Sequence, residues 1–347
     1  MWFVENLPKG ATGKILRREI TIPTSENDHV TMAMRNSVPT GTVDRNVTQH
    51  AKEFPTMTTP DSPADAFNGT KHVVDGLSVY CVDTAPAATT RPTVVAVHGI
   101  PESSVAWRDV AAAVGDSARM VIPDLPGFGQ SDKPSDYDYS LARQSRLLEK
   151  LLARVVPEAP IHLAVHDIGG PVGLMWAMRN PDRVASLLIL NTTMFHERFR
   201  PPPMALKALV PVIGPRTVAE ALSRESEFKR AFLRPCARPI DAATLDELHA
   251  PYRQPDACRA AALTWSAYKR GLPEFVRTRR ALPRITAPTT VLFGARDPYC
   301  TPASARAFAS RIPHARRRLL DDVGHFTPTE APAEVADELI SLVQQAK

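Results

Sequence analysis

The chain has 347 residues, of which 44% are hydrophobic and 23% are charged. These fractions are typical of globular proteins and argue against bulk disorder, and no apolar run reaches the roughly 18 residues that a membrane span needs. The net charge of +5 is small, and the densest basic cluster, Arg316-Arg317-Arg318, has no interleaved aromatic residues. Nucleic-acid binding is therefore not expected, and the cluster is read as a solvated face near a strand edge.

The first 66 residues differ in composition from the rest of the chain. Residues 21–66 are rich in Thr, Ser, Asn, Pro and Met without periodicity, which predicts a flexible leader. No basic segment followed by an apolar core opens the chain, so no secretory signal is expected. Four widely spaced cysteines without a CxxC motif favour reduced thiols over disulfides or a zinc site. Together these features indicate a cytoplasmic protein.

From His72 onward, strands alternate with helices. Asp75-Gly76 between two short strand-like runs predicts a hairpin over residues 72–80. Apolar runs without clean alternation predict strands buried on both faces of a parallel sheet at Thr93–Val97, Arg119–Ile122, Ile161–Val165, Ala185–Leu190 and Thr289–Phe293. Helical spacing predicts helices at Ser140–Val155, Pro171–Arg179, Ala303–Ser310 and Pro332–Gln345. This order predicts an α/β fold with a doubly wound, mostly parallel sheet.

One long interval breaks this rhythm. Between Thr193 and about Gly271 the sequence is helical and punctuated by prolines. We predict that residues 194–271 form a helical cap. The core would then consist of residues 67–193 and 272–347.

A candidate nucleophile lies at one strand-to-helix junction. Gly169 and Gly170 supply the small residues that a tight turn needs, and such a turn would expose Asp167 at the carboxyl edge of the sheet. No G-x-S-x-G motif occurs, so the serine nucleophile typical of such turns is missing. A carboxylate here would form an ester with an alkyl carbon instead of an acyl-enzyme. Taken alone, Asp167 fits a helix cap equally well.

Two further residues are expected at the same edge. Asp297 follows the strand predicted at Thr289–Phe293, and His325 lies in a loop before the final helix. The chain order of nucleophile, acid and histidine is that of the α/β-hydrolase arrangement. His325 would activate water against the ester while Asp297 orients it. A lone histidine in a glycine-containing loop is usually structural, but this order favours a catalytic role.

Two loops would complete the site. Backbone N–H groups of Ile100 and Ile168 are the candidate oxyanion hole. The glycine-rich segment 123–132 superficially resembles a phosphate cradle, but it lacks G-x-x-x-x-G-K-[ST]. We interpret it as scaffold. No cofactor and no metal are therefore expected.

These residues resemble the aspartate-nucleophile branch of the α/β-hydrolases, which contains epoxide hydrolases and haloalkane dehalogenases. The resemblance covers roughly residues 70–345. Residues 98–104 (HGIPESS) with Trp107-Arg108 look like the epoxide-hydrolase HGxPES…WR loop, and residues 166–170 (HDIGG) are similar to the HDxGG turn of both families. Residues 125–134 (LPGFGQSDKP) and 188–192 (LILNT) look more like dehalogenases. The resemblance implies an α/β-hydrolase fold with a cap.

The departures from these families concern the leaving group. Dehalogenases hold the halide with side-chain donors where this chain has Ile100 and Ile168. Epoxide hydrolases protonate the ring oxygen with cap tyrosines, and Ser266 stands where one of them would be. Tyr252, Tyr268 and Ser266 are the candidate proton donors; a tyrosine that merely pins the cap is the alternative. Trp107 and Trp265 are expected to line the substrate pocket together with Tyr252 and Tyr268.

The extreme N-terminus carries a second resemblance. Residues 1–20, with ENLPKGATGKILRRE at 5–19, resemble the C-terminal tail of an acyl-CoA ligase, and Lys14 matches that family's adenylation lysine. Without the rest of a ligase, Lys14 has no acyl site to complete, so we interpret the segment as an orphan tail.

The sequence therefore predicts a hydrolase that acts through an alkyl ester on Asp167. Its substrates would be a small apolar organic molecule and water, and epoxide ring opening is favoured because the leaving oxygen stays attached. Haloalkane hydrolysis is the alternative. A ligand-binding protein on a disabled hydrolase fold is the alternative from another class.

Overall fold

One sheet organises the chain. The computed structural model describes residues 67–86, 90–157, 159–192 and 194–346. Within them, eight strands have the order β1-β2-β4-β3-β5-β6-β7-β8. Their bounds are β1 Gly69–Val74, β2 Leu77–Asp83, β3 Thr93–Val97, β4 Arg119–Pro123, β5 Ile161–His166, β6 Val184–Leu190, β7 Thr289–Gly294 and β8 Arg316–Leu320. The β1–β2 and β2–β4 pairs are antiparallel and the remaining pairs are parallel, which confirms the predicted fold class. The predictions for residues 1–20 and 21–66 lie outside the described residues.

Helices cover both faces of the sheet. The core helices are α1 Arg108–Val114, α2 Leu141–Val155, α3 Gly169–Arg179, α10 Pro302–Ala309, α11 Thr327–Glu330 and α12 Pro332–Gln345. Within β3, Val95 and Val97 pack in the cluster that contains α3, while Val94 and Ala96 pack in the cluster that contains α1 and α12. Successive side chains of a strand point to opposite faces, so a strand covered on both sides carries no polar alternation. This is why the unbroken apolar runs identified the strands.

Strand β8 was not predicted, and its composition explains why. Arg316, Arg317 and Arg318 are exposed, because β8 is the last strand of the sheet and pairs only with β7. Arg316 and Arg318 both reach the buried carboxylate of Glu338 on α12. An edge strand needs only one covered face, and charged side chains there discourage pairing with other chains. A search for apolar runs therefore does not detect this strand, because three of its residues are arginines.

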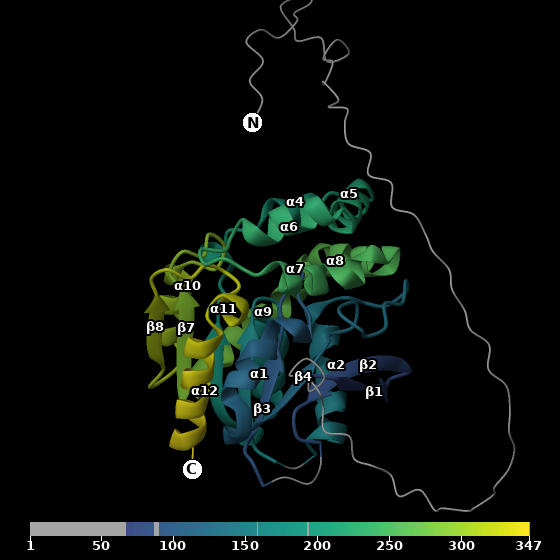
Figure 1. Cartoon of the computed structure of the whole chain (residues 1–347). Coiled ribbons are helices and arrows are strands. Elements are labelled where there is room, and N and C mark those ends of the chain that lie inside the picture. The colour runs from purple at the N-terminus through teal and green to yellow at the C-terminus, as the bar shows by residue number, and fades with distance from the viewer. Residues whose placement is uncertain (1–66, 87–89, 158, 193, 347) are drawn as a thin grey trace, which may run out of the picture. The chain divides into compact units, whose positions relative to one another are not determined.

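A helical insertion lies between β6 and β7. It contains α4 Pro203–Ala208, α5 Ile213–Ser223, α6 Glu225–Leu233, α7 Ala242–His249, α8 Pro255–Ala267 and α9 Leu272–Ala281. Figure 1 shows α4, α5 and α6 as an outer layer above α8, and α4 and α5 both contact α8. The predicted cap boundary at residue 271 falls directly before α9, which contacts α3 of the core. None of the described helices is both long and apolar enough to cross a bilayer.

Gly294, at the end of β7, marks a close approach of two backbones. A Cβ atom added there would lie 2.0 Å from the carbonyl oxygen of Gly324 and 2.5 Å from that of Val323. Both neighbours are main-chain atoms in the loop that leads to His325, so they cannot move aside as a flexible side chain can.

We predict that Gly294→Ala lowers the free energy of unfolding by about 3 kcal/mol, because the methyl group must displace that loop. Urea denaturation measures the change. Gly271→Ala is the matched control, because its Cβ would lie 3.6 Å from Phe275, an ordinary contact distance. Equal stability of the two variants would contradict the prediction.

Candidate active site

Asp167 sits at a strained turn between β5 and α3. Its φ of +46° is uncommon for a residue other than glycine and is typical of a functional turn. The Asp167 carbonyl accepts hydrogen bonds from the Gly170 N–H at 3.0 Å and from the Thr192 hydroxyl at 2.5 Å. A Cβ on Gly170 would lie only 2.0 Å from Thr192 Oγ1, so glycine is required there. The turn thus presents the Asp167 carboxylate at the edge of the sheet, where the Ile100 N–H donates to its Oδ2 at 3.0 Å.

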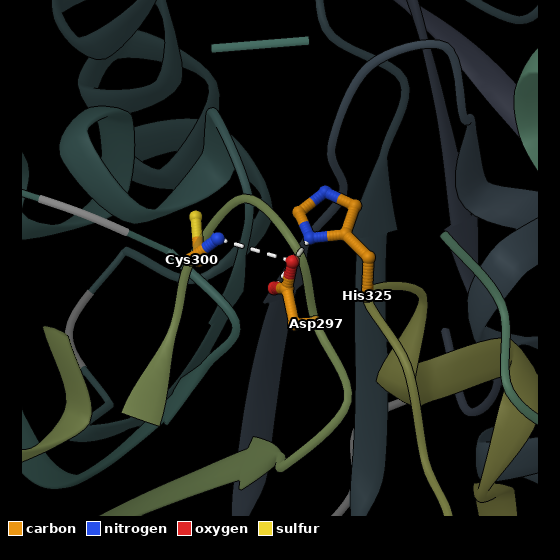
Figure 2. Close-up of side chains that lie close together, drawn as sticks. All are labelled: Asp297, Cys300 and His325. Atoms are coloured by element: carbon orange, nitrogen blue, oxygen red, sulfur yellow. Dashed lines mark hydrogen bonds and ion pairs between the residues drawn. The ribbon is translucent and has the colours of Figure 1, made fainter. Parts of the chain in front are cut away.

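His325 lies between two carboxylates. Its Nδ1 is 2.7 Å from Asp297 Oδ2, as Figure 2 shows. Its Nε2 lies 3.9 Å from Asp167 Oδ2, longer than a hydrogen bond but within ion-pair range. The structure therefore brings together the three residues that the sequence predicted, Asp167, Asp297 and His325.

Asp297 is held from all sides. Its Oδ2 also accepts a hydrogen bond from Asn191 Nδ2 at 2.8 Å, and its Oδ1 accepts from the N–H groups of Tyr299 and Cys300 at 2.7 and 3.0 Å. Asn191 follows β6, the strand between β5 and β7, and its own Oδ1 accepts from the Gly294 N–H at 2.8 Å. The carboxylate can therefore turn only one lone pair, that on Oδ2, toward His325.

The buried carboxylate and imidazole shift each other's titration. Burial alone would raise the pKa of Asp297, but the charge and hydrogen bond of His325, with the Asn191 amide, outweigh it and lower that pKa. Burial alone would lower the pKa of His325, but the charge of Asp297 and the interaction with Asp167 outweigh it and raise that pKa well above its ordinary value. The two neighbouring carboxylates therefore favour the protonated form of the His325 imidazole.

A second buried pair supports His325 from behind. His166 Nδ1 lies 2.7 Å from Glu102 Oε2, and His166 Nε2 lies 2.8 Å from the backbone carbonyl of His325. A carbonyl only accepts, so Nε2 carries a proton and donates it. Glu102 Oε2 also accepts from the Gly99 N–H at 3.1 Å, next to Ile100. The pair thus fixes the backbones of both His325 and the Ile100 loop.

A mostly apolar cavity of about 320 Å³ opens above these groups. Asp167 and His325 lie at its floor with Ile100 and Ile168, and Trp265 and Tyr268 of the insertion line it as predicted from the sequence. Burial raises the pKa of Tyr268, so its phenol stays protonated as a hydrogen-bond donor. Ile168 is the first residue before α3, and the oxyanion role of its N–H stays a prediction.

Two predicted pocket residues, Trp107 and Tyr252, and the candidate proton donor Ser266 do not line this cavity. Trp107 is fully buried in the cluster beneath α1 and α12, on the face of the sheet away from α3. Tyr252 is buried against Phe228, with ring centroids 5.2 Å apart. The Ser266 hydroxyl donates to the carbonyls of Ala208 and Ala262, so it is committed to the backbone. Spacing along the chain did not reveal which way these side chains point.

Asn191, Tyr299 and the Glu102–His166 pair were not predicted as site residues. Asn191 follows a predicted strand, as Asp167 does. Its position along the chain could therefore have predicted that it lies at the same carboxyl edge of the sheet. Tyr299 lines the cavity two residues after Asp297, and its ring centroid is 5.4 Å from that of His325. Glu102 and His166 belong to motifs that carried the family resemblance, and only the fold shows that they touch.

The ligand atoms of Asp297, Cys300 and His325 lie within 4.8 Å of one another, a spacing that a metal ion would fit (Figure 2). The donor set does not suit one. Both oxygens of Asp297 already accept hydrogen bonds, and burial raises the pKa of the Cys300 thiol well above its ordinary value, so a thiolate ligand is disfavoured.

Comparison with known proteins places this geometry in a family. The sequence model of the alpha/beta hydrolase fold matches residues 92–281. A cis-3-alkyl-4-alkyloxetan-2-one decarboxylase of Shewanella oneidensis is 43% identical over 116 residues, which cover 33% of this chain and 36% of that protein. Haloalkane dehalogenase 2 of Mycobacterium bovis is 25% identical over 256 residues, 72% of this chain and 87% of that protein. The crystal structure of Cfl2 from Burkholderia cenocepacia superimposes with a TM-score of 0.69 at 26% identity, covering 79% of this chain and 95% of the other.

The fold and the site define an enzyme of the α/β-hydrolase superfamily, in the branch whose nucleophile is an aspartate. The chain belongs to the α/β-hydrolase fold family.

The pKa shifts of Asp297 and His325 predict that this pair stabilises the fold within a limited range of pH. A lowered carboxyl pKa contributes stability above the unfolded value of 3.8, and this is lost as the pH falls. A raised imidazole pKa contributes stability below the unfolded value of 6.5, and this is lost as the pH rises through the folded value. Asp297→Asn should therefore lower the free energy of unfolding by about 2 kcal/mol near pH 6, and by less at either extreme.

Urea denaturation across pH measures this profile. Asp322→Asn is the control: Asp322 is exposed and its pKa is lowered by the side-chain hydrogen bond of Arg238, so solvent screens the pair and little change is expected. A pH-independent cost of Asp297→Asn would contradict the prediction.

Proposed function

We propose that this hydrolase opens a strained cyclic oxygen electrophile by attack of the Asp167 carboxylate on a saturated ring carbon. The observation that carries the proposal is the apolar cavity above Asp167, whose floor offers isoleucines at the two positions where a halide would need side-chain donors. The helical insertion that walls this cavity, residues 194–271, would act as the cap predicted from the sequence.

The titration of His325 fits a two-step reaction. In the free enzyme, the charge of Asp297 and the interaction with Asp167 raise the pKa of His325. Esterification removes the charge of Asp167, so the pKa of His325 falls at the moment when a base is needed. His325 can then take a proton from water that attacks the ester, while Asp297 holds the resulting imidazolium.

The leaving group separates the candidate substrates. A departing halide carries a full charge away from carbon and needs donors on both sides. Here Ile100 and Ile168 provide only backbone N–H groups, and that of Ile100 already bonds Asp167. In ring opening, the leaving oxygen stays covalently attached to the substrate. The site therefore does not need to stabilise a departing ion, but it must prevent the ring from closing again. Haloalkane hydrolysis is therefore the less favoured alternative.

Among strained rings, we favour an oxetan-2-one. The observation behind this choice is the 43% identity to the Shewanella decarboxylase, above the 25% to the dehalogenase, over a segment that spans about a third of each chain. Asp167 would attack ring carbon 4, and the carbon–oxygen bond would break with its electron pair moving to a carboxylate. Loss of carbon dioxide would then move the carbon–carbon bonding pair into an alkene and expel the Asp167 carboxylate. The steps consume no water and need no proton donor.

An epoxide is the second candidate, favoured by Tyr268 and Tyr299. The oxygen of an opening epoxide becomes an alkoxide, which needs a proton. Both phenols line the cavity, and burial raises the pKa of each, which keeps them protonated. Water activated by His325 would then release a vicinal diol.

His325→Gln should trap the ester on Asp167 because the variant cannot activate water. Intact-protein mass spectrometry after mixing with an epoxide should show a gain equal to the whole substrate. A bromoalkane would add its mass less hydrogen bromide. An oxetan-2-one should give alkene even with this variant, because its route uses no water. Asp167→Ala is the control and should give neither adduct nor alkene; an adduct on it would refute Asp167 as the nucleophile.

Tyr268→Phe and Tyr299→Phe test the epoxide route. Loss of the proton donor should lower kcat for an epoxide by about 10²-fold and leave turnover of an oxetan-2-one nearly unchanged. Tyr252→Phe is the matched control, because that buried hydroxyl does not line the cavity. Equal losses for Tyr252→Phe and Tyr268→Phe would show that the phenols act only through folding.

A further inference from the structure

The outer layer of the insertion carries a cluster of exposed apolar side chains. Leu206, Val210, Val212 and Ile213 are 52%, 52%, 70% and 68% exposed, and they make up most of the exposed large hydrophobic residues in the described part of the chain. We call these four residues the α4–α5 tip, because they lie where α4 ends and α5 begins. Single exposed apolar residues are ordinary, but a cluster marks a surface that meets another apolar phase.

The backbone holds this tip outward. Val212 has φ +65° and ψ −57°, and the Ile213 N–H donates to the Pro211 carbonyl at 2.7 Å, which closes a tight three-residue turn. This conformation is strained for a β-branched residue. The strain is not offset by burial of Val212 within the chain. A Cβ on Gly214 would lie 2.0 Å from the Lys207 carbonyl, so the turn is packed firmly against α4.

The segment that carries the tip has basic side chains and no acidic ones. No Asp or Glu occurs between Glu197 and Glu220. Arg200, Lys207 and Arg216 lie in this interval, are exposed, and form no ion pair with any described residue. Aliphatic side chains close to unpaired cations suit a layer with anionic groups at its surface and an apolar interior.

We propose that the α4–α5 tip docks the enzyme on an anionic lipid surface. The tip would enter the boundary between headgroups and acyl chains, and Lys207 and Arg216 of the same segment would meet lipid phosphates. A protein partner is less suited, because interface centres favour aromatic residues and deplete lysine, whereas the tip has no aromatic side chain.

Docking here would place the cavity beside the lipid. Met204, Ala205 and Leu209 of the same segment line the cavity, so α4 has one side toward the cavity and Leu206 exposed on the other. An apolar substrate dissolved in the bilayer would meet this wall first. This consequence rests on the proposed function, whereas the docking itself does not.

Co-sedimentation of the full chain with vesicles tests the docking. We expect at least about tenfold stronger binding to phosphatidylcholine mixed equally with phosphatidylglycerol than to phosphatidylcholine alone. High salt should weaken it, since it screens exposed charges. The double variant Val212→Glu/Ile213→Glu should lose the binding, and Arg216→Gln should weaken it. Val73→Glu is the matched control, because Val73 is 62% exposed on β1, and it should bind as wild type does.

Circular dichroism and turnover of a short, water-soluble substrate should be unchanged in the double variant, because neither residue lines the cavity. Binding that survives in the double variant, or no binding of wild type to either vesicle, would overturn the proposal. So would a dimer, detected by light scattering, that the double variant abolishes without any vesicle binding; the tip would then be a contact between copies. Vesicle binding without turnover of any ring substrate would count against the proposed function alone.

Discussion

One imidazole shared by two carboxylates is the interaction on which the site depends. The Nδ1 of His325 lies 2.7 Å from Asp297 Oδ2 and its Nε2 lies 3.9 Å from Asp167 Oδ2, so a protonated imidazole there offsets the repulsion between the two carboxylates. The sheet sets the spacing, because the two aspartates follow β5 and β7 with β6 between them. Asn191, at the end of β6, fills the gap and binds Asp297. Three neighbouring strand ends therefore fix one electrostatic arrangement.

The buried Glu102–His166 pair contributes to this arrangement by positioning backbone groups more than by stabilising the fold. A carboxylate and an imidazole without solvent contact gain little net stability from their attraction, because the loss of hydration offsets it. Their hydrogen bonds instead reach the His325 carbonyl and the Gly99 N–H. Positioning, more than stability, accounts for this buried pair, because its hydrogen bonds hold the backbones of both His325 and the Ile100 loop.

The sequence predicted the parts of the molecule that follow from local pattern. Apolar runs predicted β3 to β7 because both faces of these strands are covered. The positions that follow β5 and β7 predicted Asp167 and Asp297 as site residues. Pattern failed where a residue's surroundings come from distant segments. Arg316 to Arg318 form a strand only because β7 lies beside them. Tyr252 and Tyr268 are equally plausible by spacing, and α8 and η7 (Tyr268–Gly271) turn only Tyr268 into the cavity.

Under the proposed function, the insertion would affect the reaction by limiting the access of water as well as by shaping the cavity. The insertion is bonded directly to His325, because the backbone N–H of His325 donates to the Pro235 carbonyl at 3.0 Å. Under the proposed mechanism, an alkyl ester on Asp167 in this apolar cavity would persist until a water molecule reaches His325. An intermediate that can expel carbon dioxide does not have to wait, whereas an epoxide-derived ester does. Under the proposed mechanism the substrate therefore decides between elimination and hydrolysis. Elimination would need Asp167 alone, whereas hydrolysis would also need His325, Asp297 and the water that the insertion admits.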